Sequence, residues 1–137
     1  MVNKVIKVGT IEVPMRASAA TPRFYRNKIG RDLFNDMRTL KEAADKVKGD
    51  NKIDLSMLEL EVFENVAYVM AWTADVDENG NHLHNVADHL PTAEENIGAW
   101  LESIDGVFSV YEALPQILDL WQLNNLQMSD SKKKVAL

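Results

Sequence analysis

The 137-residue chain contains no cysteine. Disulfides, thiolate nucleophiles and metal sites built on cysteine are therefore excluded, and the absence agrees with a reducing cytosol. The chain also has no run of about 18 apolar residues, so we expect no transmembrane helix. Its first residues lack the apolar stretch of a signal peptide. No Gly-x-Ser-x-Gly elbow and no glycine-rich phosphate loop are present, and we expect a protein that is not an enzyme and uses no cofactor.

Basic residues are in the minority, and the formal net charge is −6. An acidic surface repels phosphate backbones and anionic lipid headgroups, so nucleic acid and membranes are disfavoured as partners. Hydrophobic residues make up 46% of the chain, which is enough for a packed core. The length fits one domain.

Residues 4–16 have the alternating pattern of a β-hairpin, with Gly9-Thr10 as a two-residue turn. Ile6 and Val8 would share a face with residues 11, 13 and 15. Pro14 has no N–H to donate, so its strand is expected at a sheet edge. Because a lone hairpin is marginal in water, helices or a second chain must cover its apolar face.

The rest of the pattern predicts about five helices. The first is a short helix from Thr21-Pro22 to Gly30, the second spans Arg31–Lys48, and the third runs from Asp54 to about Asp75. The fourth begins at the capping box Thr92–Glu95 and ends at a break at Asp105-Gly106. The fifth follows a second capping box, Ser109–Glu112. Within the last helix, Pro115 predicts a kink or a restart.

Helix 54–75 should be the most buried, since Leu58, Val62, Val66, Val69 and Thr73 line one face. The predicted fold class is α+β, mainly α: an N-terminal hairpin followed by five helices in a bundle-like domain. The domain is expected to span residues 1–126. Residues 127–137 are polar and uncapped, and we expect a flexible tail there.

The hypothesis of a metal-binding site rests on the loop of residues 75–89. Asp75-x-Asp77-x-Asn79-Gly80 begins like a calcium loop, but Val86 stands where a bidentate Glu is needed. All the histidines also lie here, at positions 82, 84 and 89, beside Asp88. No His-Glu-x-x-His arrangement accompanies them. A solvated polar loop is the favoured interpretation, and a metal-binding enzyme or sensor is the alternative.

Three further features have structural as well as functional interpretations. The basic cluster Arg23, Arg26, Lys28 and Arg31 is interleaved with Phe24 and Tyr25, which allows a DNA-binding module but favours a salt-bridged helix surface. Glu59, Glu61 and Glu64 could form an acid–base pair, but this spacing is typical of the solvent-exposed face of an amphipathic helix. The tryptophans, at positions 72, 100 and 121, lie in apolar stripes and predict core anchors or an interface.

Four segments together resemble the tail assembly chaperones of siphophages and prophages of Gram-positive bacteria. They are the hairpin with its continuation TPRFYRNKIGRDL, then AYVMAWTAD, then WLESIDGVFSVYEALPQILDLWQLN, and finally SKKK. The resemblance covers most of the chain. Residues 76–95 depart from it, because the loop with three histidines is longer than expected.

The resemblance implies a chaperone that binds the tape measure protein and keeps it soluble while major tail protein polymerises around it. Such proteins act in the host cytoplasm and do not usually remain in the mature virion. A programmed frameshift often adds a second domain that contacts the major tail protein. Lys132-Lys133-Lys134 is compatible with a slippery codon run or with a solubilising tail. The hairpin edge and the aromatic residues also favour self-association. Neither the resemblance nor the chemistry singles out binding residues.

Overall fold

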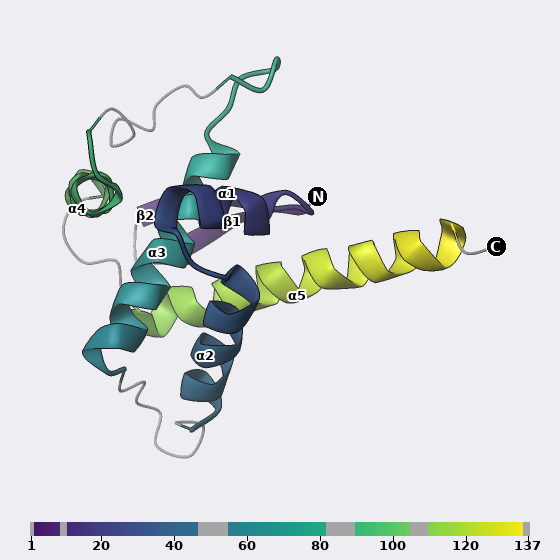
Figure 1. The fold of residues 1–137 in the computed structure, drawn as a ribbon, viewed down its shortest axis with the longest axis horizontal. Helices are drawn as coiled ribbons and strands as arrows, with labels where there is room; N and C mark the ends of the chain where they lie inside the picture. The colour runs from purple at the N-terminus through teal and green to yellow at the C-terminus, as the bar shows by residue number, and fades with distance from the viewer. Residues whose placement is uncertain (1, 9–10, 47–54, 82–89, 105–109, 136–137) are drawn as a thin grey trace.

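The computed structural model describes residues 2–8, 11–46, 55–81, 90–104 and 110–135. For residues 46, 110–111 and 127–135 it describes the backbone alone. A two-stranded antiparallel hairpin is followed by five helices, which confirms the predicted α+β, mainly α class (Figure 1). The predicted turn at Gly9-Thr10 lies outside the described residues.

Strands β1 (Val2–Val8) and β2 (Ile11–Ala17) form the hairpin, with Ile6 opposite Val13 and Val5 opposite Pro14. One face carries the buried side chains of residues 6, 8, 13, 15 and 17, as the alternation predicts. That face contacts α3 and α5, so helices of the same chain cover it. Both strands are edge strands, which agrees with the expectation for Pro14.

Helix α1 spans Thr21–Ile29 and ends at Gly30, whose φ of 80° is the left-handed conformation expected of a C-cap. Thr21 was the expected N-cap, but it is the first helical residue, and Ala20 precedes the helix without a side-chain cap. The reason is a local bond: Thr21 Oγ1 accepts from the N–H of Ser18 at 2.8 Å, so the hydroxyl faces the preceding turn.

Helix α2 spans Leu33–Lys46. Its start lies two residues later than expected, because Asp32 Oδ1 accepts from the N–H of Phe34. Leu33, Met37 and Leu40 are buried as predicted. Phe34, which was also expected on that face, is 53% exposed, although its ring contacts Trp121 edge-on at 5.5 Å between centroids.

Helix α3 spans Met57–Ala74 and runs through the centre of the domain. The predicted start at Asp54 lies outside the described residues. The helix begins after Ser56, which forms a reciprocal capping box with Glu59. Residues 62, 66, 69 and 73 are buried as predicted, but Leu58 is 59% exposed, so its predicted place in the core is wrong.

Helix α4 spans Ala93–Ser103, and Thr92 accepts from the N–H of Glu95 as its N-cap. The expected reciprocal bond is replaced by one from the Thr92 hydroxyl to the Glu95 carboxylate. Asn96 is buried, and its amide makes two hydrogen bonds to the backbone of Leu90. The N-terminal side of α4 is thereby fastened to the end of the preceding loop. The predicted break at Asp105-Gly106 lies outside the described residues.

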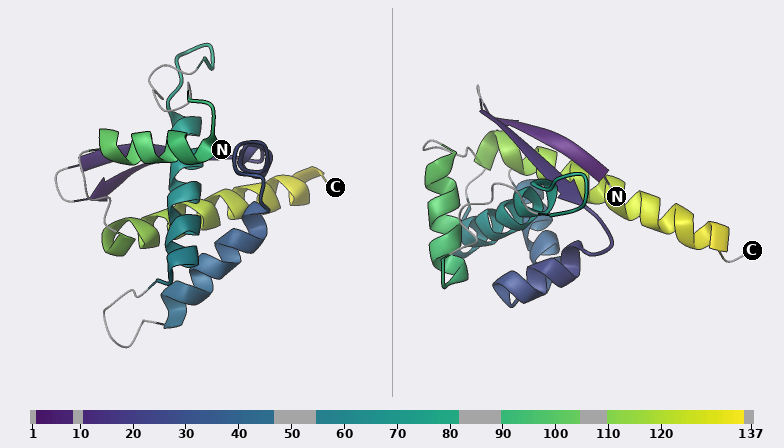
Figure 2. Two further views of the ribbon diagram at one scale, coloured as in Figure 1. Left: turned by 60° about the vertical axis from the view of Figure 1, so that its left-hand side comes forward. Right: turned by 90° about the horizontal axis from the view of Figure 1, so that it is seen from above.

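Helix α5 spans Val110–Val135, and Pro115 lies within it without restarting the helix. Residue 109 of the second predicted capping box is not described. Backbone at 127–135 is helical where the sequence predicts a tail, since no glycine or proline follows Pro115 to end the helix. Figures 1 and 2 show this end of α5 projecting beyond the other elements. The domain boundary at residue 126 stays a prediction.

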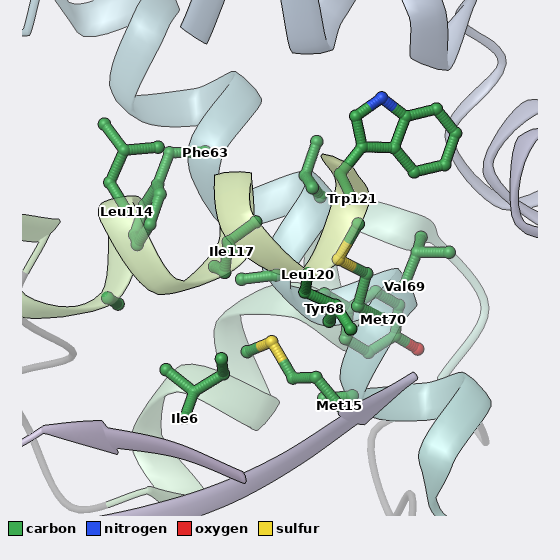
Figure 3. Packing of buried hydrophobic residues seen from close by; sticks show 14 of the residues in the cluster. Ile6, Met15, Phe63, Tyr68, Val69, Met70, Leu114, Ile117, Leu120 and Trp121 are labelled. Atoms are coloured by element: carbon green, nitrogen blue, oxygen red, sulfur yellow. The ribbon is translucent and has the colours of Figure 1, made fainter. Parts of the chain in front are cut away.

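The core lies where the hairpin, α3 and α5 meet. In Figure 3 Ile6 and Met15 of the hairpin point toward the side chains of α3 and α5. Met70, Leu120 and Ile117 are completely buried at this junction. None of the helices in the described part of the chain has both the length and the apolar composition that crossing a lipid bilayer requires.

Candidate protein-binding surface

A buried polar cluster joins α1, α2 and the turn between them. The Tyr25 hydroxyl donates to Asp36 Oδ2 at 2.6 Å, and Arg31 donates to both oxygens of the same carboxylate at 2.8 Å. The side chain of Asp36 is 1% exposed and that of Arg31 is 43% exposed. The bidentate pair therefore has one face toward water, which lowers the cost of burying the carboxylate.

The cluster fixes the protonation states of its members. Burial would raise the pKa of Asp36, but the hydrogen bonds from Arg31 and Tyr25, with the Arg31 charge, hold it below its usual value. Burial, and then the hydrogen bond to Asp36, raises the pKa of Tyr25 above its ordinary range. Tyr25 stays a neutral donor and Asp36 a charged acceptor. We call these three residues the polar lock, because the Tyr25 hydroxyl and two N–H groups of Arg31 all donate to one carboxylate and so tie α1 to α2.

The four cations of the predicted basic cluster do not form one exposed group. Arg31 is held by Asp36, and Lys28 Nζ lies 3.8 Å from the ring centroid of Trp72. Arg23 and Arg26 are exposed on α1, whereas Phe24 meets Trp72 edge-on at 5.4 Å between centroids. Two of the four cations thus serve the fold. The aromatic residues that would stack on bases are occupied within the domain.

The acidic loop after α3 has an internal explanation. The Asp77 carboxylate accepts from the backbone N–H groups of Asn79 and Asn81, and Gly80 has a φ of 83°. These bonds, the one from Asn81 first, hold the pKa of Asp77 below its usual value. Within the described ranges, no three acidic or histidine side chains gather as a metal site would require. Residues 82–89, with all the histidines, lie outside those ranges.

Trp100 and Trp121 are buried, and Trp72 is half-buried. Trp100 meets Tyr68 of α3 edge-on at 5.9 Å between centroids, and Trp121 meets Phe34 of α2. Each tryptophan therefore contacts an aromatic ring of a different element. The predicted role as a core anchor is confirmed for Trp100 and Trp121, whereas Trp72 lies at the edge of the core.

A small hollow lies between the open end of the hairpin and the end of α3. Its volume is about 190 Å³, and it is lined by Asn3, Lys4, Val5, Pro14, Met15 and Ala74. Cavities that hold cofactors or metabolites usually exceed about 300 Å³ and converge several polar groups. The hollow does neither, and it supports no small-molecule site.

The surface that remains unexplained is apolar. Several large hydrophobic side chains are exposed on two helices: Met57, Leu58 and Leu60 at the start of α3, and Leu123 and Leu126 on α5. Sequence reasoning missed the first group, because it counted Leu58 as core and passed over Met57 and Leu60. These three residues follow directly after the Ser56 cap, and helical periodicity does not show whether a neighbouring element covers the start of a helix.

Compared with protein-family models, with curated proteins and with solved structures, the chain matches none of them.

Proposed function

We propose that this protein is a phage tail assembly chaperone, which binds the tape measure protein and keeps it soluble while major tail protein polymerises around it. The observation that carries the proposal is the exposed apolar surface on α3 and α5. Met57 is 90% exposed, Leu58 59% and Leu126 56%. Helices that expose such side chains beside charged ones are suited to cover the apolar stripe of another helix reversibly.

The fold supports this role through its rigidity. The buried side of α3 packs on β2, α1 and α2, so the exposed side is presented on a fixed scaffold. A preorganised surface loses less side-chain and backbone freedom on binding than a flexible one. The sequence resemblance described above supports the identity of the partner. No contact within residues 75–81 favours the alternative of a metal-binding enzyme or sensor.

Co-expression with a tape measure protein tests the proposal. We expect the tape measure protein to move from the pellet to the supernatant when this chain is present, and to co-purify with it. A tape measure protein that precipitates equally in both cases would refute the proposal. The matched control is an acidic helical protein of similar size, because a general effect of charge on solubility would appear with it too.

The proposal includes two products of the gene. The short product acts in the host cytoplasm, and a form extended by frameshifting at Lys132–Lys134 continues from the end of α5 and contacts the major tail protein. Mass spectrometry of infected or induced cells should find both forms, and purified virions should contain neither. Light scattering of the purified short form tests the expected self-association.

A further inference from the structure

The first two turns of α3 carry one continuous strip of side chains, exposed up to Glu61 and half-buried at Glu64. Met57, Leu60, Glu61 and Glu64 lie at steps of three, four and seven, which places them on the same helix face. Leu58 lies beside Glu61 on the flank of this strip, and Leu60 is 42% exposed. We call these five residues the α3 surface. It joins three large apolar side chains to two carboxylates.

Folding does not require the apolar part of this surface. The start of α3 is already fixed by the capping box between Ser56 and Glu59. The opposite face holds the core through Val62, Phe63 and Val66, each no more than 2% exposed. Polar residues at the exposed positions would preserve the helix and improve solubility. The three apolar side chains are therefore explained best by a partner that covers them.

The carboxylates indicate the charge of that partner. Within the described part of the chain, neither Glu61 nor Glu64 forms a salt bridge, and Arg31, the cation whose charge Glu61 stabilises, is held by Asp36. Glu64 is half-buried, and burial together with the charge of Glu61 raises its pKa. Two carboxylates that form no salt bridge within the described residues, and that lie among apolar side chains, are complementary to a lysine or arginine that arrives with an apolar surface.

We propose that the α3 surface binds an amphipathic helix whose apolar stripe is flanked by lysine or arginine. This inference rests on the proposed function, since it names where the tape measure protein binds and which of its segments are recognised. The occupant packs leucine-sized side chains on Met57, Leu58 and Leu60. Its cations pair with Glu61 and Glu64, which relieves their mutual repulsion.

Two synthetic amphipathic peptides with the same leucine spacing, one with lysine and one with glutamate on the polar face, serve as probes. Calorimetry with the full chain should show binding of the lysine peptide, weakened by salt, and no binding of the glutamate peptide. The double variant E61Q/E64Q should weaken binding about tenfold. The variant L58Q/L60Q should abolish it.

The variant V5T is the matched control, because it alters an exposed apolar residue of β1 outside the apolar surface of α3 and α5, and it should leave the affinity unchanged. Circular dichroism melting confirms that each variant is folded. No binding of the lysine peptide, equal binding of both peptides, or equal affinity of E61Q/E64Q and the wild type would each overturn the proposal. So would a dimer that occludes the α3 surface, which light scattering of wild type and L58Q/L60Q would reveal.

The two proposals fail in different ways. If wild type and L58Q/L60Q keep the tape measure protein soluble equally well, the chaperone function stands and the α3 surface is the wrong site. If the lysine peptide binds at the α3 surface but the tape measure protein still precipitates, the surface stands and the chaperone function fails.

Discussion

Both parts of helix α3 carry large hydrophobic side chains, but those of its first turn are exposed to solvent and those of the rest are buried. From Val62 to Thr73 the helix is covered on nearly every side, and Phe63, Tyr68 and Met70 are at most 1% exposed. In its first turn Leu58 and Leu60 are as hydrophobic, yet both are exposed. The difference lies in the elements that pack on each part: β2, α1, α2, α4 and α5 contact α3, but nothing in the described part of the chain covers the exposed face of its first turns.

The comparison separates two uses of hydrophobic residues. Apolar area removed from water stabilises the fold, whereas apolar area left in water can only contribute free energy to an association. Hydrophobicity alone cannot distinguish the two. The buried end of α3 should therefore respond to substitution through stability, and the exposed end through binding.

The largest difference is expected between Phe63→Ala and Leu58→Ala. Phe63→Ala leaves a cavity against α5 and should lower the free energy of unfolding by about 4 kcal/mol. Leu58→Ala should change it by less than about 0.5 kcal/mol, since the side chain is already in water. Urea denaturation followed by circular dichroism measures both. Similar losses for the two variants would show that the first turn of α3 belongs to the core.

The next effect is expected at the polar lock that holds α1 and α2 beside the buried end of α3. Asp36→Ala removes the acceptor shared by Tyr25 and Arg31, and should cost about 3 kcal/mol, because the buried tyrosine hydroxyl loses its acceptor. Tyr25→Phe removes one hydrogen bond and should cost about 1.5 kcal/mol. Chemical denaturation tests this order, and an Asp36→Ala variant as stable as the wild type would contradict the lock.

The same lock gives a pH dependence. The pKa of Asp36 is lower in the folded than in the unfolded chain, so its contribution to stability is complete above the unfolded value of about 4 and is lost as the pH falls through the folded value. The free-energy difference between wild type and Asp36→Asn should therefore shrink from pH 6 to pH 3. Glu64, whose pKa is raised, acts in the opposite direction, and Glu64→Gln in both backgrounds removes its contribution. A difference that stays constant with pH would count against a charged Asp36.

The periodicity of the sequence predicted the hairpin and the helices, but it did not predict which neighbouring element buries each of their faces. The hairpin and five helices follow from alternation, helix spacing and caps such as Gly30. The exposure of Leu58 and Phe34 could not be read in the same way, because a helical stripe shows which residues share a face and not how far the neighbouring element extends. The lock was missed for a related reason: Arg31 was grouped with nearby cations, although its partner Asp36 lies only five residues away.

One long-range contact lies beyond any local pattern. The side-chain amide of Gln116 donates to the backbone C=O of Lys7 and accepts from its N–H, across 109 positions in sequence. It occupies the outer edge of β1 as a neighbouring strand would, and its Nε2 also donates to the carbonyl of Glu112. On β2 the corresponding protection comes from Pro14, which has no N–H to offer.

Gln116→Ala should therefore cost about 1 kcal/mol and also open the strand edge. We expect a lower urea midpoint and more self-association by light scattering. Gln122→Ala is the control, since Gln122 is exposed on the same helix and lies away from the hairpin bond. If both variants associate to the same extent, the edge of β1 is not what Gln116 protects.

The smallest effect is expected at the far end of α3, where a half-buried tryptophan is covered by a cation. Lys28 Nζ lies over the ring of Trp72, and a cation–π contact of this kind is worth about 0.5 kcal/mol at an exposed site. Lys28→Gln should lower the free energy of unfolding by that amount and increase quenching of tryptophan fluorescence by iodide. Arg26→Gln, on the same helix, controls for the lost charge, which would itself alter quenching by an anion. Equal quenching in the two variants would mean that α1 and Phe24 already shield Trp72, and that the covered end of α3 depends on packing alone.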